Sequence, residues 1–309
     1  MYNITICAVI WGADESILNI DLGDGFVFKK MSLIPEKDHL NKIFQKDAIG
    51  LRIDYEGARI DNDLNVICLY KTYSIDLDIK KVNDYYTKIL RRLDTKIRII
   101  RLYNEGAIRF KWLSVIIESN NLSSESNEVK DRRMSIIPIG EAMATREISK
   151  LRVSNTDIVQ INNMLKMVDY QMLNLPFDDT IVNNAHRYYD LSYHVEKNVA
   201  LTLLITCLEL LFLKSESTKK EKMSKRCAAF LYETKYERIT CYRQLKSLYK
   251  KRCEFVHDGI DSRIENEDII FLRECVRKSI LKYLNTNCNK SDLIIKLRSK
   301  VKMLDYWNS

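Results

Sequence analysis

The pattern of apolar and polar positions divides the chain into a mixed first part and a helical second part. Runs of β-branched and aromatic residues predict strands in the first part, over residues 4–11, 66–77, 97–102, 107–118 and 134–139. For residues 107–118 a helix remains the alternative. The glycines at 23 and 25 favour a hairpin over residues 17–28. Apolar residues at helical spacing predict helices over 80–93 and 156–173.

From residue 179 onward the apolar residues follow a helical period. The expected helices cover residues 181–213, 227–231, 242–256, 266–284 and 291–301. Gly259 is expected to end the third of them, because glycine adopts the left-handed conformation without steric cost. We therefore predict an α+β protein with a boundary between Leu173 and Asp179. A mixed α/β domain over 1–175 precedes an all-α bundle of five helices over 176–309.

Composition and charge narrow the class of protein. A chain of 309 residues that is 46% hydrophobic and 30% charged is typical of a soluble protein with two folded domains. The net charge of +8 is compatible with a polyanionic partner but does not establish one. The longest apolar run, residues 199–213, is too short to span a membrane, and the N-terminus lacks the layout of a secretion signal. Eight scattered cysteines without a CxxC pair favour reduced thiols in the cytoplasm and argue against a zinc site.

The strongest chemical signal lies at the end of the third expected helix. Arg252 and His257 are five positions apart there, just before Gly259. Arginine is a permanent cation whose planar fork suits a phosphate, and histidine exchanges a proton near neutral pH. Metal-free RNA cleavage needs both properties. Positions five apart on an ideal helix differ in direction by about 140°, so the two side chains diverge unless the helix end distorts or a symmetric dimer joins two pairs.

Three motifs of the second part match one known family. Residues 207–212 read Cys-Leu-Glu-Leu-Leu-Phe, residues 225–231 read Lys-Arg-Cys-Ala-Ala-Phe-Leu, and residues 249–259 hold the Tyr, Arg, Val, His and Gly of the third motif. With these motifs, the portion from about Asp179 to Leu284 resembles the HEPN superfamily, in particular its Apea-like branch. One departure is Cys253, where the family often has serine or a larger polar residue.

The resemblance implies a helical bundle that forms a homodimer and acts as an endoribonuclease with an Arg-x4–6-His motif. Such an enzyme uses no metal or other cofactor and leaves 2′,3′-cyclic phosphate and 5′-hydroxyl ends on RNA. Family members serve in bacterial anti-phage defence by abortive infection or act as toxins. A regulatory trigger or an antitoxin would then be a further partner. The N-terminal domain would sense the trigger or restrain the active site. The alternative is a non-catalytic HEPN module that binds RNA or a partner protein.

Glu209 completes the expected catalytic set of Arg252, His257 and Glu209. It is the only charge in a run of fifteen residues, and a buried carboxylate needs a partner. Arg226 or Arg252 is the expected partner, which makes Glu209 either an orienting residue or half of a structural salt bridge.

Cations and tyrosines near these motifs are candidates for contact with RNA. The expected RNA-binding residues are Lys222, Lys225, Arg226, Tyr249, Lys250 and Lys251. For the lysine-rich segment 217–225, a solvated loop is the alternative. Further tyrosines, at positions 188, 189, 193, 232, 236 and 242, are candidates for stacking on unpaired bases. Packing in the core is the default expectation for them. His186 and His194 share one face of the helix expected over 181–213, but with no third ligand they predict no metal site.

Overall fold

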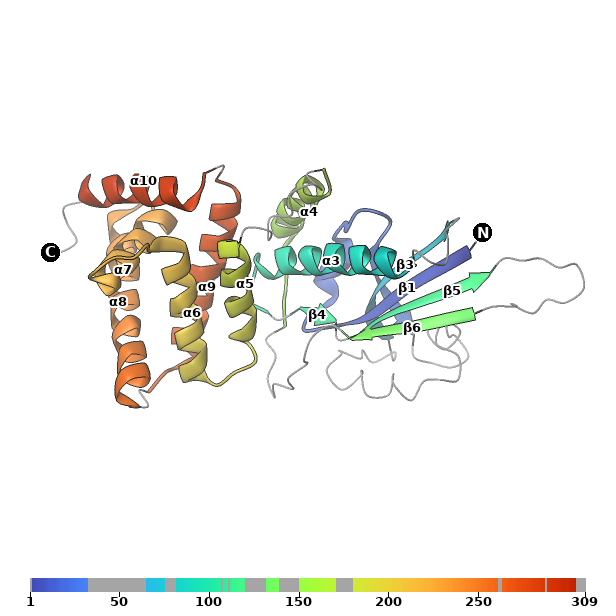
Figure 1. Ribbon diagram of the computed structural model, residues 1–309, viewed down its shortest axis with the longest axis horizontal. Coiled ribbons are helices and arrows are strands. Elements are labelled where there is room, and N and C mark those ends of the chain that lie inside the picture. Colours follow the sequence, from blue (N-terminus) through green and yellow to red (C-terminus); the bar gives the residue numbers. More distant parts are fainter. Residues whose placement is uncertain are drawn as a thin grey trace, which may run out of the picture. The chain divides into compact units, whose positions relative to one another are not determined.

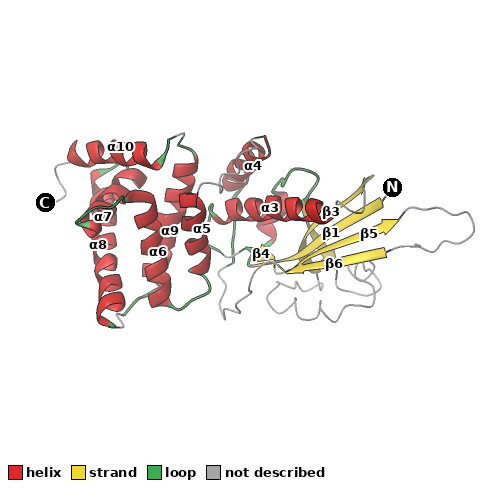
Figure 2. Ribbon diagram, in the orientation of Figure 1, coloured by secondary structure: helices red, strands yellow, loops and turns green. Residues whose placement is uncertain are grey.

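The computed structural model describes residues 2–32, 65–75, 82–106, 108–110, 112–119, 132–138, 150–170, 180–260, 263–286 and 288–303. The chain divides into two compact units, Met1–Met172 and Leu173–Ser309 (Figure 1). The first unit contains an antiparallel sheet and the second is helical (Figure 2). The α+β class predicted from the sequence is thereby confirmed. The predicted boundary lies within residues 171–179, outside the described residues.

The sheet of the first unit has the strand order β2-β3-β1-β5-β6, with β4 paired to β1. Its strands are β1 (Tyr2–Trp11), β2 (Val27–Ser32), β3 (Asn65–Ile75), β4 (Arg109–Phe110), β5 (Trp112–Ser119) and β6 (Arg132–Pro138). Strand β1 lies between β3 and β5, in a register that pairs Ile6 with Lys71 on one side and with Val115 on the other. Every residue from Ile6 to Trp11 is buried, so both faces of this part of β1 are covered.

Helices α3 (Val82–Arg101) and α4 (Asn155–Tyr170) complete the first unit, and α3 runs along the sheet in Figure 1. Lys96 of α3 is 1% exposed, and its ammonium donates to the Leu22 carbonyl and lies 3.3 Å from a carboxylate oxygen of Asp24. A buried lysine is tolerated only when it is paired in this way. The contact fixes the loop before β2 against α3.

Over their described residues, the strands expected over 4–11, 66–77, 107–118 and 134–139 are confirmed, as are the helices expected over 80–93 and 156–173. The hairpin expected over 17–28 is wrong, because Glu15–Asn19 form a 3-10 helix. Asp14 caps that helix by accepting from the Ser16 amide at 3.0 Å and the Ser16 hydroxyl at 2.6 Å, which favours a turn over an extended strand. The strand expected over 97–102 is also wrong, since residues 97–101 form the last turns of α3 and Leu102 lies in the following turn, with Ile97, Ile99 and Ile100 buried. Burial of isoleucines in a core overrides their preference for strands.

Six described helices make up the second unit instead of the five expected. They are α5 (Thr180–Leu191), α6 (Lys197–Phe212), α7 (Lys219–Leu231), α8 (Lys235–Asp258), α9 (Asn266–Leu284) and α10 (Lys290–Met303). Helix α6 contacts each of the other five. Its buried face includes Leu204, Leu208 and Phe212, and with these contacts α6 forms the centre of this unit.

The single helix expected over 181–213 is interrupted at Ser192. The Ser192 hydroxyl donates to the Tyr189 carbonyl at 2.6 Å, and Arg273 of α9 donates to the Ser192 carbonyl at 2.6 Å. These bonds take up groups that a continuous helix would use, and they end α5. His194 consequently lies in the turn before α6, so it does not share a helix face with His186.

Among the helices of the described segments, none has both the length and the apolar character required to cross a bilayer.

Candidate functional site

Helix α8 carries the candidate catalytic residues, and local capping defines both of its ends. At its start the Thr234 side chain accepts from the Glu237 amide at 3.3 Å and its hydroxyl donates to the Glu237 carboxylate at 2.6 Å. At its end Gly259 has a φ of 65° and donates its backbone N–H to the Glu254 carbonyl. The helix end predicted at Gly259 is confirmed.

Tyr249 of α8 is bound to Glu209 of α6. Its hydroxyl donates to Oε1 of Glu209 at 2.6 Å, and its ring is buried. Burial, and then the neighbouring carboxylate of Glu209, raise the pKa of Tyr249 above its ordinary value. The expected partner of Glu209 is therefore wrong: within the described chain no ion pair joins Glu209 to Arg226 or Arg252. The physical reason is that Arg226 is occupied by Glu216, at 2.9 Å.

Arg252 lies one turn after Tyr249, and one of its hydrogen-bond donors has no acceptor among the described residues. Its guanidinium carbon is 5.9 Å from the centroid of the Tyr249 ring, which places the cation over the aromatic face. The Nε atom is buried and has no hydrogen-bond partner among the described residues. A buried donor without an acceptor is costly, and such groups deserve a functional explanation. The Glu209–Tyr249–Arg252 group is thus a cation held over an aromatic ring, with no ion pair of its own among the described residues.

His257 lies in the last turn of α8 and is exposed. The helix continues regularly from Arg252 to Asp258, so the two side chains leave the axis in directions about 140° apart. No hydrogen bond or ion pair joins them within the described part of the chain. The helix end does not distort in the way that would bring Arg252 and His257 together within one copy of the chain.

The residues expected to bind RNA are held in differing ways. Arg226 is 4% exposed and donates to Glu216 and, at 2.8 Å, to the Phe212 carbonyl, so it lies inside the unit. Lys225 lies 5.6 Å from the Tyr242 ring centroid. The other lysines form ion pairs: Lys222 with Glu216 at 3.4 Å, Lys250 with Glu254 at 3.4 Å, and Lys251 with Asp268 at 3.0 Å.

The candidate stacking tyrosines separate by exposure. Tyr189, Tyr193 and Tyr242 are buried, which leaves no ring face for a base. Tyr236, in the first turn of α8, is 81% exposed.

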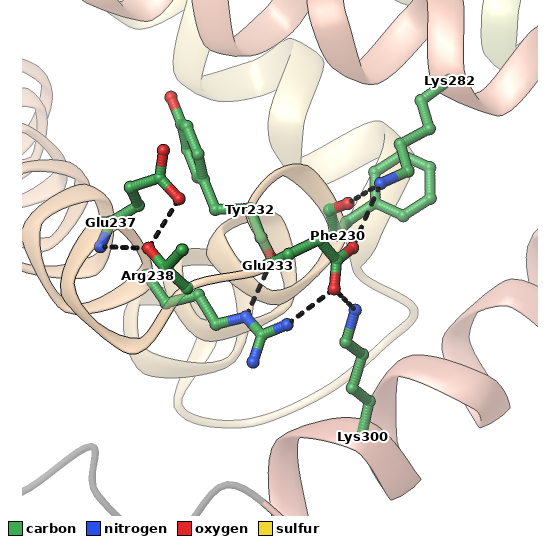
Figure 3. A network of polar contacts seen from close by, with 8 residues as sticks. Phe230, Tyr232, Glu233, Glu237, Arg238, Lys282 and Lys300 are labelled. Atoms are coloured by element: carbon green, nitrogen blue, oxygen red, sulfur yellow. Dashed lines mark hydrogen bonds and ion pairs between the residues drawn. The ribbon is translucent and has the colours of Figure 1, made fainter.

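Two clusters, in each of which several cations share one glutamate, were not foreseen from the sequence. In the Glu233 cluster, Glu233 lies 3.0 Å from Arg238, 3.8 Å from Lys282 and 3.4 Å from Lys300 (Figure 3). In the Glu216 cluster, Glu216 binds Lys222, Arg226 and, at 2.6 Å, Arg298. Arg226 and Arg298 lower the pKa of Glu216 to about 2, and Lys300 is the main cause that lowers the pKa of Glu233. The partners lie as many as 82 positions apart, so no local pattern announces either cluster.

Among the described residues, no group of three or more His, Cys, Asp or Glu side chains is arranged to hold a metal ion.

Comparison with known proteins adds no relative: no protein-family model matches the chain, and neither a curated protein nor a solved structure is significantly similar to it.

Proposed function

We propose that this chain is a metal-independent endoribonuclease of the HEPN type, in which Arg252 binds the scissile phosphate and His257 transfers a proton. The observation that carries the proposal is the state of Arg252. Its Nε donor is buried without an acceptor among the described residues, beside a tyrosine fixed by Glu209. A phosphate oxygen is the kind of acceptor that a guanidinium in this position binds best.

The reaction uses few protein groups. The RNA 2′-oxygen attacks the neighbouring phosphorus, the bond from phosphorus to the 5′-oxygen breaks, and a 2′,3′-cyclic phosphate forms. The 2′-hydroxyl proton goes to a base, and the leaving 5′-oxygen gains a proton from an acid. His257 is exposed in the last turn of α8, and an imidazole side chain can fill either role. Arg252 stabilises the charge that develops on the phosphoryl oxygens.

A homodimer would bring an Arg252 and a His257 side chain close together. Because Arg252 and His257 point in different directions on one helix, a site that uses both is most simply built from Arg252 of one copy and His257 of the other. The end of α8 offers apolar surface for such contact, since Val256 is 44% and Ile260 is 54% exposed. The second copy would cover these side chains.

The biological setting follows from the same family resemblance. An RNA-cutting enzyme of this kind would act in the cytoplasm, as a toxin or in anti-phage defence. The sheet-containing unit would then sense a trigger, or lower the activity of the nuclease without abolishing it.

The test is incubation of the purified protein with a mixed RNA pool in EDTA, followed by mapping of the 3′ ends. The wild type should produce cyclic-phosphate ends, and His257→Ala should abolish them. His194→Ala, a histidine in a turn of the same unit, is the matched control and should cut like the wild type. Cyclic ends that persist in His257→Ala would sink the assignment of His257.

A second candidate function is a non-catalytic HEPN module that binds RNA. The regular helix between Arg252 and His257 favours it, because one copy of the chain does not assemble the pair. Under this alternative, RNA binding survives His257→Ala and no cyclic-phosphate ends appear with any variant.

A further inference from the structure

The Glu216 and Glu233 clusters share an imbalance of charge. In each, three cations form ion pairs with one carboxylate among the described residues. No second carboxylate pairs with Lys282, Lys300 or Arg298 within the described part of the chain. Helix α10 contributes to both clusters, through Arg298 to the first and Lys300 to the second. The surplus of positive charge therefore lies on either side of α7, because Glu216 precedes this helix and Glu233 follows it.

These cations are accessible to a partner. The side chains of Lys222, Lys282, Lys300 and Arg298 are between 37% and 49% exposed, and that of Glu233 is 72% exposed. Figure 3 shows Lys282 and Lys300 reaching Glu233 from two different helices, while Arg238 approaches it from α8. A single exposed carboxylate does not neutralise both Lys282 and Lys300, so the cluster attracts further negative charge from solution.

The position of the surplus charge relative to Arg252 and His257 sets the size of the partner. Arg238 lies near the start of α8 and His257 in its last turn, nineteen residues later. At 1.5 Å per residue this is about 28 Å along the helix axis. A partner that touches both ends of α8 must therefore be an extended polyanion. Tyr236 adds an exposed aromatic ring at the cationic end.

We propose that the Glu216 and Glu233 clusters form a second binding surface, which holds the phosphate backbone of single-stranded RNA at a distance from Arg252 and His257. Basic groups that follow a backbone, together with an aromatic ring for base stacking, are how single strands are bound without sequence preference. The choice of RNA as the polyanion rests on the proposed function. The surface makes RNA length a determinant of binding, because a tetranucleotide is too short to reach both ends of α8 and a long strand is not.

The test measures binding of fluorescent RNA by anisotropy in the His257→Ala background, so that the RNA stays intact. A strand of about 30 nucleotides and a tetranucleotide are compared. The variant is Lys282→Ala with Lys300→Ala, and the matched control is Lys150→Ala with Lys166→Ala, two exposed lysines of the other unit. The cluster variant should raise the Kd for the long RNA about tenfold and reduce the slope of log Kd against log salt by about 1.4, for two lost contacts. The tetranucleotide should lose less affinity than the long RNA, and the control should show no change.

For a second variant, the Kd for the long RNA is expected to fall instead of rise. Glu233→Gln removes the exposed carboxylate but keeps its size, so it should tighten binding of the long RNA by about two- to fivefold. A cluster that only stabilises the fold predicts no such gain. Equal Kd values for the cluster variant and the control would overturn the proposal. So would absence of long-RNA binding by the parent protein, or displacement of the RNA by polyglutamate at equal charge concentration.

Cleavage is measured separately with otherwise wild-type protein in EDTA. If the long RNA is bound through the clusters but never cut, the nuclease proposal fails while the binding surface stands. If RNA is cut and the cluster variant binds and cuts like the control, the binding surface fails while the nuclease stands.

Discussion

Helix α8 contains the same arrangement twice, at Tyr242 and at Tyr249. Each tyrosine is buried and donates its hydroxyl to a glutamate of another helix, Glu221 of α7 and Glu209 of α6 respectively. Each also has a cation over its ring. The two tyrosines are seven positions apart, which places them within about 20° of the same direction on the helix. The surroundings of the two carboxylates are nevertheless different.

At Tyr242 the charges are paired. Lys246 lies 2.6 Å from Glu221 and 5.5 Å from the Tyr242 ring centroid, so one lysine closes the arrangement. At Tyr249 neither Glu209 nor Arg252 has an ion pair among the described residues, and Nε of Arg252 has no acceptor. The comparison teaches that one local motif can serve stability when its carboxylate is paired with a cation (closed). The same motif can leave a cation available for binding when the carboxylate is not so paired (open). The Tyr242 group is therefore an internal control for the Tyr249 group.

The largest expected difference is in catalysis. Arg252→Ala should lower the rate of RNA cleavage at least about 100-fold, because it removes the group that stabilises the phosphoryl charge. Lys246→Ala should leave the rate within about threefold, as this lysine is already paired. The measurement is the initial rate of cyclic-phosphate formation. Equal losses in the two variants would mean that the open arrangement has no special role.

A smaller effect is expected from the two carboxylates. Glu209→Gln should reduce cleavage about tenfold by loosening Tyr249 under Arg252, whereas Glu221→Gln should have little effect. Adding Glu209→Gln to Arg252→Ala should then lower the rate no further, because both changes act on one group. Additive losses in this double-mutant cycle would contradict a positioning role for Glu209.

Tyr249→Phe should lower the free energy of unfolding by about 1 kcal/mol more than Tyr242→Phe does. Tyr249→Phe removes the one hydrogen bond described for the Glu209 carboxylate and should cost about 2–3 kcal/mol in the free energy of unfolding. Tyr242→Phe leaves Glu221 paired with Lys246 and should cost less. Urea unfolding followed by circular dichroism measures both, and a larger loss for Tyr242→Phe would reverse the comparison.

The smallest effect should appear at alkaline pH, where both tyrosines act alike. Burial and then the adjacent carboxylate raise the pKa of Tyr242 and Tyr249 above 10.0. The unfolded chain releases these protons near pH 10 while the folded chain retains them, so stability is complete below that pH and falls as the pH rises above it. Tyr249→Phe should reduce this fall by less than about 1 kcal/mol between about pH 10 and 11. A slope unchanged by both Phe variants would show that neither tyrosine causes it.

Much of the local structure was predictable from the sequence, and the errors have identifiable causes. Alternating and β-branched runs predicted the strands, and Gly259 predicted the end of α8. The helix expected over 181–213 was broken by Arg273, a residue some 80 positions later that binds the Ser192 carbonyl. Isoleucines at 97–100 suggested a strand, but burial within a helix decided their conformation.

For the candidate site, the sequence by itself determined the residue types on α8 and the angle between Arg252 and His257. Both follow from the order of residues along one regular helix. Only the tertiary structure decided that Glu209 binds Tyr249, that Glu216 takes Arg226, and that Nε of Arg252 keeps no acceptor among the described residues. These outcomes depend on which side chains from distant segments meet. Helix packing sets such meetings, and the local period of the chain carries no information about them.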